Sequence, residues 1–141
     1  MKHPLETTKH RFSDLSWSQL GLLIGGDGLV FIVFALLGRS SHGLSDEHPL
    51  LAAVRVAWPF FVGWLLVAPW TGALRQHPPL RMIGLTSGTW LIALPVGLVL
   101  RWFQLGRSSP FSFALVTYLT VAALLIIWRG GYSWWMMRRT I

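Results

Sequence analysis

An aspartate in the first apolar segment is the residue whose type and position most directly suggest chemistry. Asp27 lies within "LGLLIGGDGLVFIVFALLG", residues 20–38, a run about as long as a bilayer is thick. An ionised carboxylate at the bilayer centre costs about 2.5 to 3.5 kcal/mol on insertion scales, so it normally faces the protein interior and has a partner there. Two interpretations stay open: Asp27 moves a proton, an ion or a polar solute, or it is a protonated or ion-paired acid that only fixes helix packing.

Three further polar residues are candidates for the same functional region. Arg55 lies about five residues inside the second apolar segment. We predict that Asp27 points toward this segment and forms an ion pair with Arg55. The alternative for Arg55 is that its side chain extends outward to the lipid headgroups. Arg39 and His42, in "GRSSHG", follow the first segment and are expected to line the outer approach to Asp27.

Glycines recur at a spacing of four in two of the apolar segments. Gly21 and Gly25 lie in the first segment, and Gly84 and Gly88 lie at a matching depth in the third. Small residues four apart share one helix face and let two backbones approach closely within a membrane. We predict that the first and third segments touch through these glycines. The alternative is that one of these faces joins two copies of the chain.

The composition of the 141-residue chain places it among integral membrane proteins. Hydrophobic residues make up 53% and charged residues 12%, against roughly a quarter charged in ordinary soluble domains. The net charge of +7 comes from Lys and Arg scattered at the ends of apolar segments, not from the dense basic stripe that binds nucleic acid. The sequence has no cysteine and no P-loop, dinucleotide, zinc-protease or serine-nucleophile motif. We therefore expect no enzyme activity, no cofactor, no metal site and no nucleic-acid partner.

Four apolar segments are long enough to cross a membrane, because roughly 20 helical residues span a hydrocarbon core of about 30 Å. The expected fold class is an all-α membrane protein, a four-helix transmembrane bundle in which short connections make consecutive helices antiparallel neighbours. Pro59 and Pro69 predict a kink in the second helix, and Gly130 and Gly131 are expected to end the fourth. The expected organisation is a cytoplasmic arm at 1–17, a transmembrane domain at 18–128 with spans at about 18–37, 50–74, 82–100 and 111–128, and a cytoplasmic aromatic and basic tail at 129–141.

The distribution of Lys and Arg predicts the orientation of the spans. Four of these residues fall on one side (Arg39, Arg55, Arg101 and Arg107), and eight fall on the side of the termini (Lys2, Lys9, Arg11, Arg75, Arg81, Arg129, Arg138 and Arg139). By the positive-inside rule both termini are cytoplasmic, as in a multi-pass protein of the cell membrane. The expected partners are the lipid bilayer, with anionic lipids at its cytoplasmic face, and either a second copy of the chain or another membrane protein.

Three stretches carry a resemblance to a known family: "GGDGLVFIVFALLGRSSHG", "WPFFVGWLLVAPWTGAL" and "WRGGYSWW". From Asp27 onward the chain resembles a family of small four-span membrane proteins of bacteria and haloarchaea that is known only as a domain of unknown function. The family features map to Asp27, to the loop residues Gly38, Arg39, His42 and Gly43, and to Pro59, Phe60 and Phe61. The resemblance implies an all-helical membrane protein and supplies no activity.

Two hypotheses for function follow from these residues. In the first, the chain is a small accessory or structural membrane protein that packs against other spans through its glycine faces. In the second, it is a proton-coupled or polar-solute permeation unit in which Asp27 is the protonatable group and Arg55, Arg39 and His42 line the outer approach. Substitution of Asp27 by Asn separates the two, because a purely structural role predicts no measurable change and permeation predicts loss of flux.

Overall fold

The computed structural model describes residues 15–41 and 48–139, and over these ranges it is built from helices without strands. Helix α1 spans Trp17–Ser41, α2 spans Pro49–Thr71, α3 spans Pro79–Leu105 and α4 spans Phe111–Arg139. All four helices are long and apolar enough to cross a membrane. The expected all-α membrane fold with four spans is therefore confirmed.

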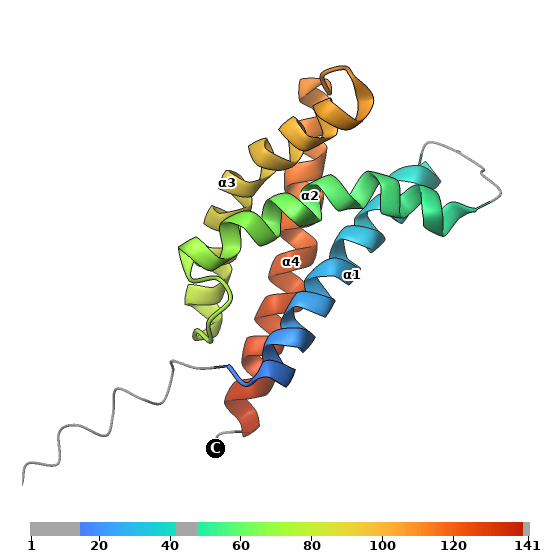
Figure 1. Cartoon of the computed structure of the whole chain (residues 1–141). Helices are drawn as coiled ribbons and strands as arrows, with labels where there is room; N and C mark the ends of the chain where they lie inside the picture. Colours follow the sequence, from blue (N-terminus) through green and yellow to red (C-terminus); the bar gives the residue numbers. More distant parts are fainter. Residues whose placement is uncertain (1–14, 42–47, 140–141) are drawn as a thin grey trace, which may run out of the picture.

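The four helices form a closed ring in which each packs against two others (Figure 1). Consecutive helices are neighbours, as predicted, and contact between α1 and α4 closes the ring. The start of α1 and the end of α4 lie at the same end of the molecule. We call this end the terminal end; the connection between α2 and α3 lies there too, because the helices alternate in direction.

Local chemistry explains where α2 and α3 begin and end. Pro49 and Pro79 are the first residues of these helices, a position where the missing N–H group has no helical partner to lose. Gly72 and Gly106 follow the last turns with φ angles of 80° and 67°, in the left-handed region that favours glycine. Both glycine N–H groups bond back to the helix they close, at Ala68 and Trp102 respectively.

A neighbouring helix compensates for one of the prolines inside α2. Pro59 has no N–H group, so the carbonyl oxygen of Arg55, four residues earlier, loses its usual helical donor. The side-chain amide of Gln104, at the end of α3, donates a hydrogen bond of 3.0 Å to that carbonyl oxygen. The proline is tolerated here because another helix satisfies the backbone group that it frees.

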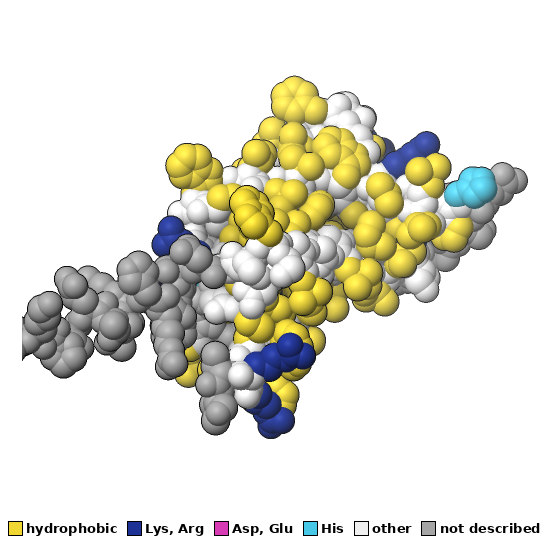
Figure 2. Space-filling model, turned by 60° about the horizontal axis from the view of Figure 1, so that its bottom comes forward, with side chains coloured by type: hydrophobic (Ala, Val, Ile, Leu, Met, Phe, Trp, Pro, Cys, Tyr) yellow, Lys and Arg dark blue, Asp and Glu magenta, His cyan; other side chains and the backbone are white. Residues whose placement is uncertain are grey.

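Aromatic side chains fill the centre of the ring. Helices at opposite corners make no close backbone contact within the described ranges, and large rings bridge them instead. Phe31 of α1 meets Trp90 of α3 with ring centroids 5.4 Å apart, and Phe60 of α2 meets Phe113 of α4 at 6.1 Å. The outer surface is also apolar: hydrophobic side chains cover much of the face in Figure 2, and Lys and Arg lie toward its margins.

The prediction that the first and third helices touch through glycines is wrong. α1 and α3 occupy opposite corners of the ring, so their backbones do not meet. Gly21, Gly25, Gly84 and Gly88 are all exposed, and a Cβ atom added at any of them would meet no atom within 4 Å. The side chains that these two helices turn to the interior are instead large rings, and Phe31 and Trp90 meet across the centre.

The closest helix approach uses a different pair of glycines. A Cβ atom added at Gly63 of α2 would lie 2.9 Å from the backbone nitrogen of Gly97 and 3.0 Å from the carbonyl oxygen of Ala93, both in α3. No side chain fits between backbones at this separation. Gly63 and Gly97 therefore set how closely α2 and α3 can pack.

The fourth helix is longer than predicted. α4 continues through Gly130 and Gly131 to Arg139, so the prediction that these glycines end the helix is wrong. Glycine ends a helix where the chain can turn into water, but in an apolar setting the backbone keeps its hydrogen bonds by staying helical. The residues that follow, "YSWWMM", are mostly apolar and extend the same helix. As a result Arg129 lies within a helix and not in a separate tail.

Candidate functional site

Asp27 lies ten residues from the start of α1, about 15 Å along the helix axis, and is fully buried. Its side chain faces the interior of the ring, as predicted. Asp27 is flanked in the sequence by Gly26 and Gly28. Trp128 of α4 packs against Gly26, and Phe61 of α2 packs against Gly28. Helix α1 is therefore close to both neighbours at the depth of the carboxylate.

Arg129 of α4 is the charged partner of Asp27. Its Nε atom donates a hydrogen bond of 3.0 Å to Oδ1 of the carboxylate, and its Nη2 atom donates a second bond to Oδ2. The two side chains form an ion pair in which both are fully buried. Two parallel N–H···O bonds between a guanidinium and a carboxylate are the geometry in which this kind of pair is strongest.

Arg129 also contacts the other two helices of the ring. Its Nη1 atom donates to the carbonyl oxygen of Ala73, two residues after the end of α2, and lies 3.9 Å from the sulfur of Met82 in α3. Its guanidinium carbon lies 4.9 Å from the ring centroid of Trp64 in α2, within the range of a cation–π interaction. One arginine side chain thus joins α1, the end of α2 and the start of α3 to α4.

Trp64 of α2 is a further hydrogen-bond donor to the carboxylate. The indole Nε1 of this buried residue donates a hydrogen bond of 3.0 Å to Oδ2 of Asp27. Asp27 therefore accepts from α4 through Arg129 and from α2 through Trp64. We refer to Asp27, Trp64 and Arg129 as the buried triad.

The predicted pair between Asp27 and Arg55 is wrong. Arg55 is exposed on α2, nearer the end of the molecule opposite the terminal end. Arg39 lies twelve residues beyond Asp27 along α1, about 18 Å away, and is half-buried. His42 lies outside the described residues. Neither Arg55 nor Arg39 is therefore brought to the buried triad, because both belong to the opposite end of the molecule.

The sequence alone predicts that Arg129 lies in the tail. Its distance from the end of α4 nevertheless indicates that it could pair with Asp27. Asp27 is ten residues after the start of α1, and Arg129 is ten residues before the end of α4. Two helices that meet at the terminal end place such residues at equal depth. This signal depends on the true end of α4, which the two glycines after Arg129 obscured.

Polar contacts continue from the buried triad toward the terminal end. Ser133, one helical turn after Arg129, donates to the carbonyl oxygen of His77 in the connection between α2 and α3. The Nε2 atom of the His77 ring lies 2.8 Å from the carbonyl oxygen of Gly72. Together with the bond from Arg129 to Ala73, these contacts fasten the α2–α3 connection to α4.

The triad is chemically closed. Both carboxylate oxygens accept hydrogen bonds from buried donors, and the guanidinium donates through all three of its nitrogen atoms. A buried charge that lost its partner would be strongly unfavourable in this low-dielectric interior, so each member of the pair stabilises the position of the other. The geometry favours a fixed connection between helices over a site that takes up a solute.

A comparison with known protein families matches residues 24–132 to one family model, described as a protein of unknown function, DUF3054. The matched range contains every member of the buried triad together with Ala73 and Met82. No curated protein and no solved structure matches the chain. Because the match covers most of the sequence and the expected four-span helical fold is present, the chain belongs to the DUF3054 family of proteins of unknown function.

Proposed function

We propose that the chain is a small accessory or structural membrane subunit, without catalytic activity, whose helices are held in one arrangement by the buried triad. The observation that carries this proposal is that one ion pair joins all four helices while both of its members are fully buried. A carboxylate that carries a proton must exchange its partners and meet water at some stage. Asp27 is instead held by donors from two other helices, which suits a permanent role.

The glycine faces of the outer surface supply the means of association. Gly84 and Gly88 lie on the exposed side of α3, where no atom of the described residues occupies the space beside them. In a membrane, a helix of another protein or of a second copy can approach such a face closely. The rigid interior and the open face together support a subunit that packs against other spans.

The proposed location is the cell membrane, with both termini in the cytoplasm. Because Arg129 is buried in the triad, it no longer counts as a flanking charge, and seven Lys and Arg residues remain on the terminal side against four on the other. The positive-inside rule still places the terminal end in the cytoplasm. There the exposed Arg138 and Arg139 meet the anionic leaflet.

Cysteine cross-linking tests the association directly, because the natural chain has no cysteine and each introduced thiol is unique. A Gly84→Cys variant in native membranes should form a disulfide-linked dimer or a cross-link to another membrane protein. The matched control is Leu66→Cys, at a similar distance from the terminal end on the exposed surface of α2, which should form neither. Equal cross-linking at both positions, or at neither, would contradict association through the α3 face.

A second candidate function is permeation of protons or a polar solute. It is favoured by Thr86 and Thr117, buried hydroxyl groups that have no hydrogen-bond partner among the described residues. Thr86 lies one helical turn from Met82, which touches Arg129. These hydroxyls are polar groups in the interior that the buried triad does not use.

Flux through proteoliposomes separates the two functions. The informative variant replaces the ion pair with apolar side chains of similar size, Asp27→Leu together with Arg129→Met, because such replacements often preserve folding. The structural role predicts that wild type and variant are equally helical and neither conducts protons above protein-free liposomes. Proton flux in the wild type that disappears in a folded variant would show that the triad takes part in permeation.

A further inference from the structure

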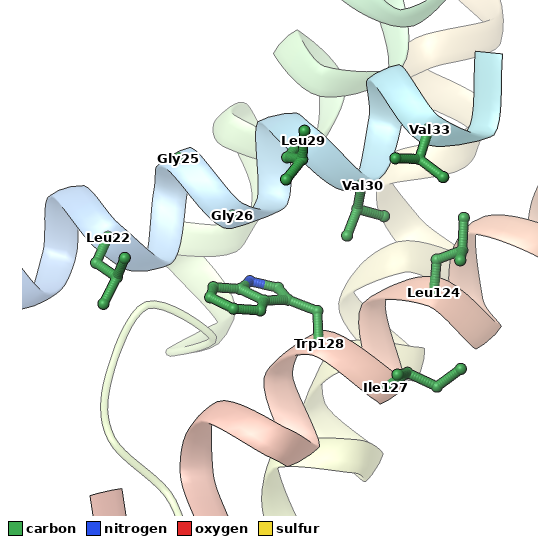
Figure 3. A pocket seen from close by; sticks show the side chains of 9 residues that line it. All are labelled: Leu22, Gly25, Gly26, Leu29, Val30, Val33, Leu124, Ile127 and Trp128. Carbon is green, nitrogen blue, oxygen red and sulfur yellow. The ribbon is translucent and has the colours of Figure 1, made fainter. Parts of the chain in front are cut away.

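An apolar groove runs between α1 and α4 on the outside of the ring (Figure 3). Its volume is about 480 Å³, and its walls are aliphatic side chains together with Gly25, Gly26 and the indole of Trp128. Trp128 forms the floor, because it packs directly against Gly26. The groove opens sideways: the rim residues Leu29 and Ile127 are 63% and 71% exposed. In a membrane its mouth faces the hydrocarbon of the bilayer.

The groove-facing stripe of α4 continues to a pair of arginines. At 3.6 residues per turn, Gly131, Trp135 and Arg138 follow Trp128 along one side of the helix. Gly131 has no side chain, and a Cβ atom added there would meet nothing within 4 Å, so it leaves the path along the surface open. The apolar groove is therefore continuous with the basic end of α4.

The end of α4 carries unopposed positive charge within the described part of the chain. The guanidinium of Arg138 stacks 3.7 Å from the ring centroid of Trp134, and that of Arg139 stacks 4.0 Å from the centroid of Trp135. The one acidic residue within the described ranges is Asp27. It is already paired with Arg129, so it does not neutralise Arg138 or Arg139. The chemistry that complements two oriented guanidinium groups beside aromatic rings is an anion such as a phosphate.

The spacing between the groove floor and the arginines matches one leaflet of a bilayer. Trp128 and Arg138 are ten helical residues apart, about 15 Å, which is half of a hydrocarbon core of about 30 Å. A molecule with its hydrocarbon chain in the groove would thus present its headgroup at the level of the arginines. A helix of a second copy could lie in the groove, but the one acidic residue of the described ranges, Asp27, is buried in its ion pair, so these ranges would offer the arginines no anion.

We propose that this groove and the two arginines together bind one anionic phospholipid, with an acyl chain lying against Gly25, Gly26 and Trp128 and the headgroup phosphate held by Arg138 and Arg139. The guanidinium groups donate to the phosphate oxygens, while the stacked indoles hold them in position. Trp128 separates the acyl chain from the buried triad behind it. This site is independent of the α3 face, so it does not rest on the accessory role.

Native mass spectrometry of the purified full chain tests the proposal with defined lipids. Delipidated protein is titrated with phosphatidylglycerol or with phosphatidylcholine carrying the same acyl chains, and bound lipids are counted by mass. We expect one phosphatidylglycerol to bind preferentially. Replacing Arg138 and Arg139 by Gln should weaken that binding by about fivefold for each arginine removed. Arg81→Gln, an exposed charge at the same end on α3, is the matched control and should leave the affinity unchanged.

A groove-filling variant tests the acyl-chain part of the site. Gly25→Phe places a large ring in space that is empty around Gly25, and it should abolish binding of the first lipid. Gly88→Phe makes the same change at an equally open glycine on α3 and should retain the lipid. A second measurement does not depend on whether the Gly25→Phe variant folds. Phosphatidylglycerol with a photoreactive group on its acyl chain, applied to the wild-type protein in nanodiscs, should label residues 22–33 and 124–128.

Three results would overturn the proposal. Equal binding of the two lipids would remove the role of the arginines. Retention of the lipid by a folded Gly25→Phe variant, or labelling confined to other helices, would remove the role of the groove. A wild-type dimer that Gly25→Phe converts to monomer, with lipid binding unchanged, would show that a second copy occupies the groove.

Discussion

Asp27 and Arg129 are separated by 102 residues of sequence, yet their side chains lie face to face and share two hydrogen bonds inside the helix ring. This relationship joins the first helix to the last. Because Arg129 also bonds to Ala73 and touches Met82, the same contact fixes the turn between the two middle helices. The contact between α1 and α4 that closes the ring therefore centres on a buried ion pair within a largely aromatic and aliphatic core.

Removing the indole donor from the carboxylate should weaken the fold by an intermediate amount. Trp64→Phe keeps an aromatic ring beside the Arg129 guanidinium but removes the N–H group that bonds to Asp27. Hydrogen bonds to charged groups contribute about 1.5 to 3 kcal/mol, so we expect a loss of this size in the free energy of unfolding. Unfolding followed by circular dichroism in mixed micelles measures it. Trp90→Phe is the control, because its indole bonds to the backbone carbonyl of Tyr118 and not to a charge.

Two adjacent glycines should respond in opposite ways to alanine. A Cβ atom at Gly26 would lie 2.0 Å from the ring of Trp128, so in Gly26→Ala either that ring or helix α1 must move. Overpacking of this kind costs about 1 to 3 kcal/mol. Gly25→Ala meets no atom within 4 Å and replaces glycine by the best helix former, so its stability should stay the same or rise by up to about 1 kcal/mol. Thermal unfolding of both variants checks the contrast, and equal losses would contradict the packing of Trp128 on Gly26.

The crossing of α2 and α3 should be more sensitive to an added methyl group than the contact at Gly26. Gly63→Ala would bring a Cβ atom to 2.9 Å from backbone atoms of α3, which cannot rotate away as a side chain can. We expect a larger loss of stability than at Gly26, together with faster trypsin cleavage at Arg75 in the α2–α3 connection. Gly88→Ala, at an open position of α3, is the control, and its stability should stay the same or rise by up to about 1 kcal/mol. Wild-type stability of Gly63→Ala would show that the two helices do not approach so closely.

The proposed orientation makes a prediction of its own. The asymmetry of seven flanking Lys and Arg against four predicts that both termini lie in the cytoplasm. A reporter enzyme that is active only outside the cytoplasm, fused after Ile141, should give no signal, whereas the same reporter inserted after Arg107 should be active. A strong signal from the C-terminal fusion would reverse the orientation.

The architecture was predictable from sequence because the membrane constrains it so strongly. Apolar length alone identifies the four spans, and the cost of an unpaired carboxylate in lipid predicts that Asp27 faces inward. The partner of Asp27 was not predictable in the same way. Gly130 and Gly131 are typical of a helix end in water, so the sequence predicts that Arg129 lies in a tail and leaves Arg55 as the nearest basic residue in the neighbouring helix.

The glycine contacts show a similar limit. The conspicuous spacing of Gly21 with Gly25 and of Gly84 with Gly88 identifies small faces, but spacing does not say whether a face turns inward or toward lipid. The contact that sets the helix separation uses Gly63, which has no small residue four positions away in either direction. Which glycine is buried depends on where the large rings of Phe31, Phe60 and Trp90 fit, and that is a property of the whole packing arrangement.

The most direct test of the account is a double-mutant cycle on Asp27 and Arg129, with the free energy of unfolding measured in mixed micelles. Asp27→Asn and Arg129→Gln each leave a buried charge without its partner, so each alone should lower stability by about 3 to 5 kcal/mol. The ion pair thus replaces the expectation from sequence that a structural Asp27 would tolerate Asn without measurable change. The double variant should lose less than the sum of the two, with a coupling energy of at least about 1 kcal/mol. The parallel cycle of Asp27→Asn with Arg55→Gln should be additive, because Arg55 is exposed and away from the triad. Additive effects for Asp27 and Arg129 would contradict the claim that this pair holds the four helices together.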